Sequence, residues 1–277
     1  MKLFITNKTI ADCVESCQSL ERVAGTTYDS FTMKKPFLIL QLRANDLAAE
    51  GEYQAFLKYG GLSDSDVERV RMEKDSLPDV ELQKYSGVIV GGGPWDVSDP
   101  IEKQSDAQIA GEKWLDKLIE QIVKLDVPYL GACYGFGALA KSHGGRVSKE
   151  QYFEDVKAAT ITLKEAASND PLLKDLPNTF EAFVGHKEAC QQLPEGAVWL
   201  GSSEECPYHL FRIKQNIYAT QFHPELDADG ICERIDVYKN AGYFPPEDAE
   251  KLKEVSRAAD ISVPQEILRR FVERYGE

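Results

Sequence analysis

The segment 127–141 constrains the fold more than any other part of the chain. It begins as a short apolar run, passes through Gly-Ala-Cys-Tyr-Gly at 131–135, and then reads as a helix. A buried strand that turns sharply into a helix leaves one side chain exposed at the bend, and flanking glycines tolerate the cramped backbone there. That side chain is Cys133. The segment therefore predicts a nucleophile at the end of a core strand.

The same position suggests how the thiol of Cys133 is activated. At the first turn of a helix, free backbone N–H groups and the helix dipole lower the pKa of a cysteine, so we expect a lowered pKa here. A structural cysteine buried on a core strand is the competing interpretation, because cysteine is among the most buried residue types. A second motif favours the nucleophile.

That second motif is Phe-His-Pro-Glu, at the end of a β-prone run at 217–225. Because strand side chains alternate with a period of two, His223 and Glu225 are expected to point to the same side. A carboxylate beside an imidazole fixes its tautomer and stabilises its cationic form. Cys133, His223 and Glu225 are therefore predicted to be a nucleophile, a general base and an orienting acid. A histidine that merely ends a strand near a turn is the alternative.

A glycine-rich turn supplies a third element of the same chemistry. Residues 88–94, Val-Ile-Val-Gly-Gly-Gly-Pro, read as a buried strand that runs into a tight turn. We expect the N–H of Gly92 or Gly93, with that of Tyr134, to form an oxyanion hole. The phosphate-binding pattern Gly-x-x-x-x-Gly-Lys-Ser/Thr is absent from the chain. Trp95 follows the turn, where it either walls a substrate pocket or packs against the core.

Taken in order, these motifs resemble those of the class I glutamine amidotransferases. The matching pieces are the Gly-Gly-Pro loop at 92–94, the Gly-x-Cys-x-Gly elbow at 131–135 and the Phe-His-Pro-Glu at 222–225. The Cys-Tyr-Gly within the elbow looks like that of the GMP synthetase amidotransferase domain. The resemblance covers about residues 36–230. It implies a γ-glutamyl thioester on Cys133, formed as ammonia leaves glutamine and then hydrolysed.

The resemblance also implies two substrate-binding positions, and each carries a departure from the family pattern. Gly137 stands where the family has a glutamine against the bound substrate, and Gly185 replaces the serine before the loop histidine, His186. An unpaired polar group on a bound ligand costs about 1–3 kcal/mol. The leading hypothesis is a cysteine-dependent hydrolase of γ-glutamyl amides that acts as a glutaminase or amidotransferase-like enzyme. A γ-glutamyl peptidase that acts on glutathione-like compounds, or a catalytically silent regulatory subunit, are the alternatives.

Composition argues against several other classes of function. The chain has 46 acidic and 32 basic residues, which disfavours nucleic acid or an anionic membrane as a partner. No apolar run approaches the ~20 residues that span a bilayer, and the N-terminus lacks a signal-peptide core, so we expect a cytoplasmic protein. Cys13 and Cys17 have no second pair of ligands nearby. We therefore expect neither a structural metal nor a cofactor.

Strands and helices alternate as far as the elbow, which is typical of a parallel sheet with helices on both faces. Beyond residue 156 short β-prone segments predict antiparallel pairing, and beyond 229 the periodicity is helical. The predicted class is α/β: a three-layer sandwich with a mostly parallel, flavodoxin-like central sheet, a small antiparallel section and C-terminal helices. Expected strands in the first half are 36–42, 67–72 and one near 88; expected helices are 46–59, 107–124, 231–240, 246–258 and 264–275.

The chain is expected to form one large domain at 33–277, preceded by an extension at 1–32. The extension either packs on a sheet edge or a partner subunit, or is partly ordered. A small-molecule substrate, glutamine or another γ-glutamyl compound, is the expected partner. No ATP-dependent synthetase segment is recognisable, so an acceptor for ammonia would be a separate synthetase chain.

Overall fold

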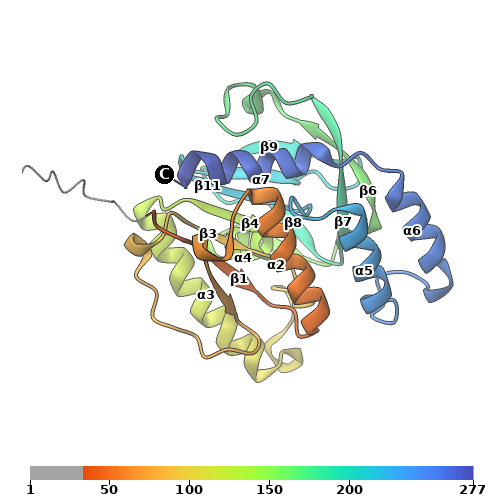
Figure 1. Cartoon of the computed structure of the whole chain (residues 1–277), viewed down its shortest axis with the longest axis horizontal. Coiled ribbons are helices and arrows are strands. Elements are labelled where there is room, and N and C mark those ends of the chain that lie inside the picture. The colour runs from red at the N-terminus through yellow and green to blue at the C-terminus, as the bar shows by residue number, and fades with distance from the viewer. Residues whose placement is uncertain (1–33, 277) are drawn as a thin grey trace, which may run out of the picture. The chain divides into compact units, whose positions relative to one another are not determined.

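A nine-stranded sheet runs through the part of the chain that the computed structural model describes, residues 34–276 (Figure 1). Its strand order is β2-β1-β3-β4-β11-β10-β9-β6-β7. The expected extension at 1–32 lies outside the described residues. The sheet has a parallel half and an antiparallel half, and the predicted α/β class is confirmed.

The parallel half contains the strands that were expected from the sequence. All four of its strand pairs run parallel. Four of the five strands are buried along their whole length, as expected for parallel strands with helices on both faces. The five strands are β1 (Phe37–Gln41), β2 (Val67–Arg71), β3 (Gly87–Val90), β4 (Tyr129–Ala132) and β11 (Ile217–Thr220).

The antiparallel half extends the same sheet instead of forming a layer of its own. A turn at 214–216 folds β10 back onto β11, and each further strand pairs antiparallel with its neighbour. Its strands are β10 (Leu210–Ile213), β9 (Val198–Ser202), β6 (Glu154–Leu163) and β7 (Thr179–His186). A separate two-stranded sheet joins β5 (Arg146–Ser148) to β8 (Ala189–Gln192), and neither strand was predicted.

Helices cover both faces of the parallel half. The alternation of β1 side chains separates two apolar clusters, since Leu38 and Leu40 join one whereas Phe37 and Ile39 join the other. Helices α3 (Asp106–Leu125) and α4 (Tyr134–Ser142) pack on the first cluster, and α2 (Asp46–Gly60) and α7 (Ser262–Tyr275) on the second. This arrangement is the expected three-layer sandwich.

Local signals explain where α2 and α3 begin and end. The side chain of Asn45 accepts a hydrogen bond from the N–H of Ala48 at 3.0 Å, and Ser105 accepts one from Gln108 at 3.1 Å. Each satisfies a backbone donor that the first helical turn leaves free. Helix α2 stops at Gly61, whose φ of 65° is readily adopted only by glycine.

Two of the C-terminal helices cover the antiparallel half. Helices α5 (Ala228–Tyr238) and α6 (Ala249–Arg257) share a third apolar cluster with β6 and β7, which includes Val156, Phe183 and Ile235. The three predicted C-terminal helices match α5, α6 and α7 to within one turn. No described helix has the length and apolarity needed to cross a membrane.

Candidate active site

Cys133 lies at the bend between β4 and α4 in a strained backbone conformation. Its φ is 50° and its ψ is −94°, a region that non-glycine residues rarely occupy. The bend is tied to the next strand, because the N–H of Cys133 donates to the carbonyl of Thr220 at 2.8 Å. A Cβ on Gly131 would lie 2.6 Å from the carbonyl of Gly135, and one on Gly135 would lie 2.7 Å from that of Val90. Crowding therefore explains both elbow glycines.

His223 and Glu225 are in direct contact, but the strand predicted at 217–225 is too long. Strand β11 ends at Thr220, and the residues after it form bends and turns. The N–H of His223 donates to the carbonyl of Phe183 at 3.1 Å, which draws the backbone toward β7. His223 Nδ1 and Glu225 Oε1 lie 2.9 Å apart. The turn, rather than strand alternation, brings the two side chains together.

The structure brings Cys133 and His223 to one pocket, together with Gly93 and Arg43. Gly92 lies directly against the imidazole, since a Cβ on this residue would be 2.4 Å from His223 Cε1. The pocket is completed by residues of α5 and of the loop that follows it, Tyr238, Tyr243 and Phe244. The glycine turn, the elbow and the histidine therefore converge on one pocket.

The expected oxyanion donors lie beside Cys133. Gly93 borders both pockets that meet at Cys133, and Tyr134 borders one of them. Among residues 34–276, neither the N–H of Gly93 nor that of Tyr134 has a hydrogen-bond acceptor. Unpaired backbone donors next to a nucleophile are what an oxyanion hole requires.

Trp95 and Gly137 border a second pocket, which Cys133 also lines. The ring of Trp95 meets that of Tyr134 edge-on, with 6.1 Å between centroids. A Cβ on Gly137 would lie 3.3 Å from Val97 Cγ2 and 3.4 Å from Glu188 Oε1. A side chain at position 137 would therefore begin in contact with Val97 and the Glu188 carboxylate.

Glu188 is a site residue that the sequence did not single out. Its two oxygens accept hydrogen bonds from the N–H groups of Val97 and Ser98, each at 2.9 Å. Burial raises the pKa of Glu188 to about 7, with Asp96 adding to the effect. A carboxyl group that titrates near neutrality therefore lines the second pocket.

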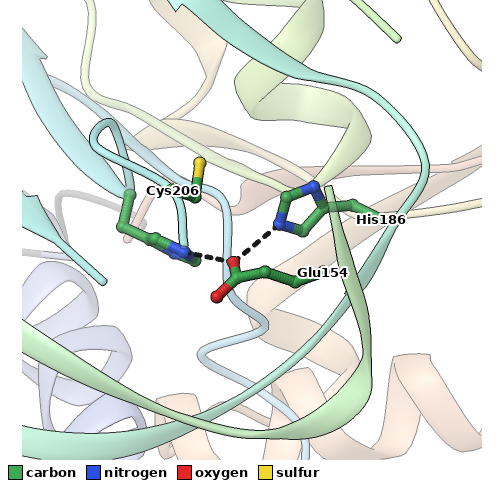
Figure 2. A group of neighbouring side chains, drawn as sticks. Glu154, His186 and Cys206 are labelled. Atoms are coloured by element: carbon green, nitrogen blue, oxygen red, sulfur yellow. Dashed lines mark hydrogen bonds and ion pairs between the residues drawn. The ribbon is translucent and has the colours of Figure 1, made fainter. Parts of the chain in front are cut away.

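His186 borders the second pocket, but its ring has no free nitrogen with which to bind a substrate. Nε2 lies 2.9 Å from Glu154 Oε2 (Figure 2). Nδ1 lies 2.8 Å from the carbonyl oxygen of Glu188. The substrate contact expected from this side chain is therefore not available. The ring is instead part of a buried cluster behind the pocket.

The charge states of His223 and Glu225 suit a base and its orienter. Burial lowers the pKa of His223, with Arg234 and Arg43 adding to the effect against the opposing charge of Glu225. The imidazole is therefore neutral near pH 7. Burial alone would raise the pKa of Glu225, but His223 and Arg234 outweigh it and hold that pKa well below its usual range. Glu225 stays ionised and can orient the ring.

The prediction of a lowered pKa for Cys133 is wrong. Burial raises the pKa of this thiol to about 12, against the opposing effect of Arg43. The negative charges of Glu188, Asp96 and Glu225 add to the rise. Near pH 7, a neutral thiol and a neutral imidazole therefore line the same pocket.

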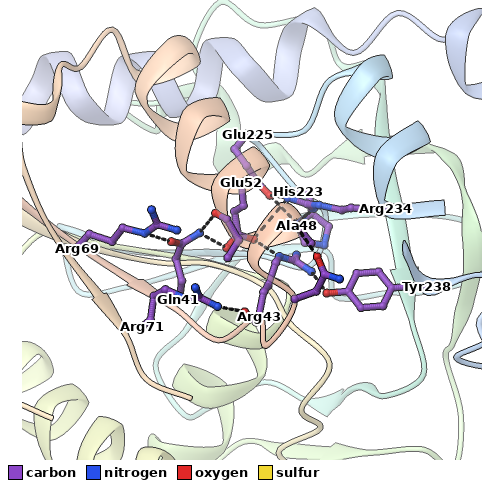
Figure 3. A network of polar contacts seen from close by, with 12 residues as sticks. Gln41, Arg43, Ala48, Glu52, Arg69, Arg71, His223, Glu225, Arg234 and Tyr238 are labelled. Carbon is purple, nitrogen blue, oxygen red and sulfur yellow. Dashed lines mark hydrogen bonds and ion pairs between the residues drawn. The ribbon is translucent and has the colours of Figure 1, made fainter. Parts of the chain in front are cut away.

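A buried network behind His223 was also missed by sequence reasoning (Figure 3). Arg234 Nη2, from α5, donates to Glu225 Oε1 at 2.9 Å and approaches Glu52 Oε1 at 3.5 Å. Arg43 Nε donates to the same Glu52 oxygen at 2.8 Å, and Gln41 Nε2 donates to Oε2 at 2.9 Å. The available signal was a glutamate on the otherwise apolar face of α2.

The network contains a group of side chains with metal-ligand chemistry, but two guanidinium groups already contact it. Glu52, His223 and Glu225 offer ligand atoms within 4.8 Å of one another. Arg43 and Arg234 already neutralise both carboxylates, and their charges repel a cation. The network therefore orients His223 and does not suit a metal.

Gly92→Ala is expected to lower kcat/KM by about 100-fold. The new methyl group would push the imidazole of His223 out of its position, and a displacement of about 1 Å is enough for a loss of this size. The clash is the 2.4 Å approach to His223 Cε1. Steady-state kinetics on the candidate substrates measures the change in kcat/KM. Gly60→Ala, on α2 and far from the pocket, is the control and should leave kcat/KM unchanged. Equal activity of the two variants would show that His223 is not held against this turn.

Comparison with known proteins points to one family. The model of the family described as glutamine amidotransferase class-I matches residues 53–229. A GMP synthase of Thermosipho melanesiensis is 36% identical over 149 residues, which are 53% of this chain and 26% of that protein. γ-Glutamyl peptidase 4 of Arabidopsis thaliana is 25% identical over 252 residues, which are 87% of this chain and 96% of that protein.

Solved structures show the same fold. The structure of a glutamine amidotransferase from Thermotoga maritima superposes with a TM-score of 0.71 at 23% identity, covering 87% of this chain and 98% of that one. The chain spans only about a quarter of the length of the GMP synthases that it matches. By contrast, it spans nearly all of the γ-glutamyl peptidase.

Proposed function

The chain belongs to the class I glutamine amidotransferase family, and from this premise we propose that it hydrolyses γ-glutamyl amide bonds through a thioester on Cys133. One observation carries the proposal. Cys133, in a strained conformation at the strand-to-helix bend, borders the same pocket as His223, whose Nδ1 lies 2.9 Å from Glu225. This arrangement supports Cys133 as nucleophile, His223 as base and Glu225 as the acid that orients it.

The reaction follows from the charge states of these groups. Neutral His223 takes the proton of the Cys133 thiol as the sulfur attacks the γ-carbonyl carbon. The N–H groups of Gly93 and Tyr134 stabilise the oxyanion that forms. His223 returns the proton to the departing nitrogen, which leaves a γ-glutamyl thioester. Water then attacks the thioester, with His223 again as base, and the glutamyl product and free thiol are released.

The second pocket indicates what kind of leaving group the site accommodates. Cys133 borders two pockets, one lined by Arg43, Tyr238 and Phe244 and the other by Trp95 and Glu188. Ammonia needs no pocket of its own, whereas an amino acid or peptide released from a γ-glutamyl bond does. Two pockets that both border Cys133 favour a γ-glutamyl peptide over glutamine. The extended match to a γ-glutamyl peptidase supports the same choice.

A substrate panel tests this proposal on the purified full chain. We expect amino-acid release from γ-glutamyl dipeptides or glutathione with a higher kcat/KM than ammonia release from glutamine. A preference for glutamine would overturn the peptide assignment and favour an amidotransferase role, in which a separate synthetase chain accepts the ammonia. Turnover of neither class would overturn the proposed reaction.

A catalytically silent subunit is distinguished by turnover rather than by alkylation. Burial raises the pKa of Cys133 to about 12, so little thiolate exists at neutral pH. Slow reaction with iodoacetamide is therefore expected of an active enzyme too. Hydrolysis assays separate the two cases.

A further inference from the structure

Four side chains with metal-binding chemistry meet behind the second pocket and have no part in the proposed reaction. Glu154 comes from β6, His186 from the end of β7, and Cys206 and His209 from the segment that leads into β10 (Figure 2). All four are buried, and their ligand atoms lie within 4.8 Å of one another. Ser203 is a neighbour, whose hydroxyl donates to Glu154 Oε1 at 2.8 Å.

We propose that Glu154, His186, Cys206 and His209 form a structural binding site for a divalent transition metal, with zinc as the best fit. Two imidazoles, a thiolate and a carboxylate are ligands that zinc takes in tetrahedral sites. A site with four protein ligands and no exposed position is of the closed, structural kind. The sequence shows no metal-binding pattern for this site, because only Cys206 and His209 are close together in the chain.

The hydrogen bonds of His186 supply the strongest argument. Nδ1 faces the carbonyl oxygen of Glu188 at 2.8 Å, and Nε2 faces a carboxylate oxygen of Glu154 at 2.9 Å. Both partners are acceptors, so a neutral imidazole, which has one N–H, satisfies only one of them. Without a metal, a neutral ring leaves one of these two acceptors without a proton from the ring.

A metal ion removes this conflict. His186 then donates from Nδ1 to the carbonyl of Glu188 and presents the lone pair of Nε2 to the metal. A ligating histidine usually donates its other N–H to a carbonyl or carboxylate in this way, which fixes its tautomer. The Ser203 hydroxyl holds the Glu154 carboxylate from its other oxygen.

His209 and Cys206 are consistent with the same centre. His209 Nε2 lies 2.5 Å from the Glu154 oxygen that His186 approaches, so both rings converge on one point. Its Nδ1 has no hydrogen-bond partner among the described residues, so this ring can carry its proton on Nδ1 and present the lone pair of Nε2 to the metal. Cys206 Sγ makes only a long contact, 3.9 Å, with the carbonyl of Tyr208. Metal binding displaces the thiol proton to solvent and supplies this sulfur with a bond.

The position of the site gives it a structural role. Glu154 and His186 are register partners in the β6–β7 pair, and a bound metal joins this pair to the loop at 203–209. The carbonyl of His209 accepts a hydrogen bond from the N–H of Gln221 at 2.8 Å, two residues before His223. The metal would therefore fasten the antiparallel half of the sheet beside the strand end that carries the general base.

Metal analysis of the full chain tests the proposal. After expression in zinc-supplemented medium and exhaustive dialysis, we expect one zinc ion per chain by elemental mass spectrometry. Replacement by Co²⁺ should give the near-ultraviolet charge-transfer band of a cobalt–thiolate bond. Cys206→Ser should abolish that band. The control Cys232→Ser, which alters a buried cysteine on α5, and Cys133→Ala should both retain it.

Two results would overturn the site. One is metal-free wild-type protein that shows no thiolate band when Co²⁺ is added, which would leave the four residues as a hydrogen-bonded cluster. The other is a band that persists in Cys206→Ser. The measurement on wild-type protein does not depend on any variant, so a Cys206→Ser chain that fails to fold leaves the proposal open to refutation. None of these readouts requires enzymatic activity, and the metal site therefore stands or falls separately from the proposed reaction.

Discussion

Cys133→Ala is expected to reduce kcat/KM for every γ-glutamyl substrate by a factor on the order of 10⁵ or more, because no other group supplies the covalent bond. The alanine variant keeps the strained backbone at the bend, whose φ is 50°. Removal of one sulfur from a partly buried position leaves the fold intact. Kinetics of amine or ammonia release, together with circular dichroism, measure both expectations.

A matched cysteine provides the control for this variant. Cys232→Ser changes a buried cysteine of α5, whose thiol donates to the carbonyl of Lys253, and should leave turnover unchanged. Mass spectrometry after brief exposure to substrate should detect a γ-glutamyl adduct on Cys133 in the wild type only. If the alanine variant retained activity within tenfold of the wild type, another nucleophile would have to exist and the proposed mechanism would be wrong.

The parts of the site that the sequence predicted are those encoded by short local motifs. Cys133 between its glycines follows from rules of backbone geometry that need no tertiary information. The Phe-His-Pro-Glu motif identified His223 and Glu225, but the turn after β11, and not the expected strand alternation, brings them together. Gly92 and Gly93 follow from the need for bare backbone near a reacting carbonyl. The alternating pattern of the first half likewise predicts a parallel sheet.

The parts that the sequence did not predict depend on contacts between distant elements. The raised pKa of Cys133 reflects enclosure by residues from several loops, which opposes the helix end that sequence reasoning emphasised. Arg234 reaches Glu225 only because α5 packs over β6 and β7. The extension of the central sheet by four antiparallel strands depends on long-range pairing. None of these contacts has a local signature.

Glu225→Gln is the second substitution with a large expected effect, because it removes the charge that orients His223. The carboxylate lies 2.9 Å from His223 Nδ1 and accepts a hydrogen bond from Arg234 Nη2 at 2.9 Å. We expect kcat/KM to fall by about 10³- to 10⁴-fold, as when the acid of a triad becomes an amide. Loss of one partner from a buried ion pair should also lower the free energy of unfolding by about 3–5 kcal/mol at pH 7.

The pH dependence separates loss of orientation from loss of stability. Glu225 raises the pKa of His223 against the larger effect of burial, so its removal lowers that pKa further and moves the acid limb of kcat/KM to lower pH. The pKa of Glu225 is itself lowered by folding, so its stabilising effect is complete above the usual glutamate pKa and fades as pH falls below it. The stability difference between variant and wild type should therefore shrink in acid.

Glu52→Gln is the matched control, since Glu52 binds Arg43 and Arg234 but not His223. It should lose stability while retaining far more activity, and equal loss of activity in both variants would reduce Glu225 to a purely structural residue.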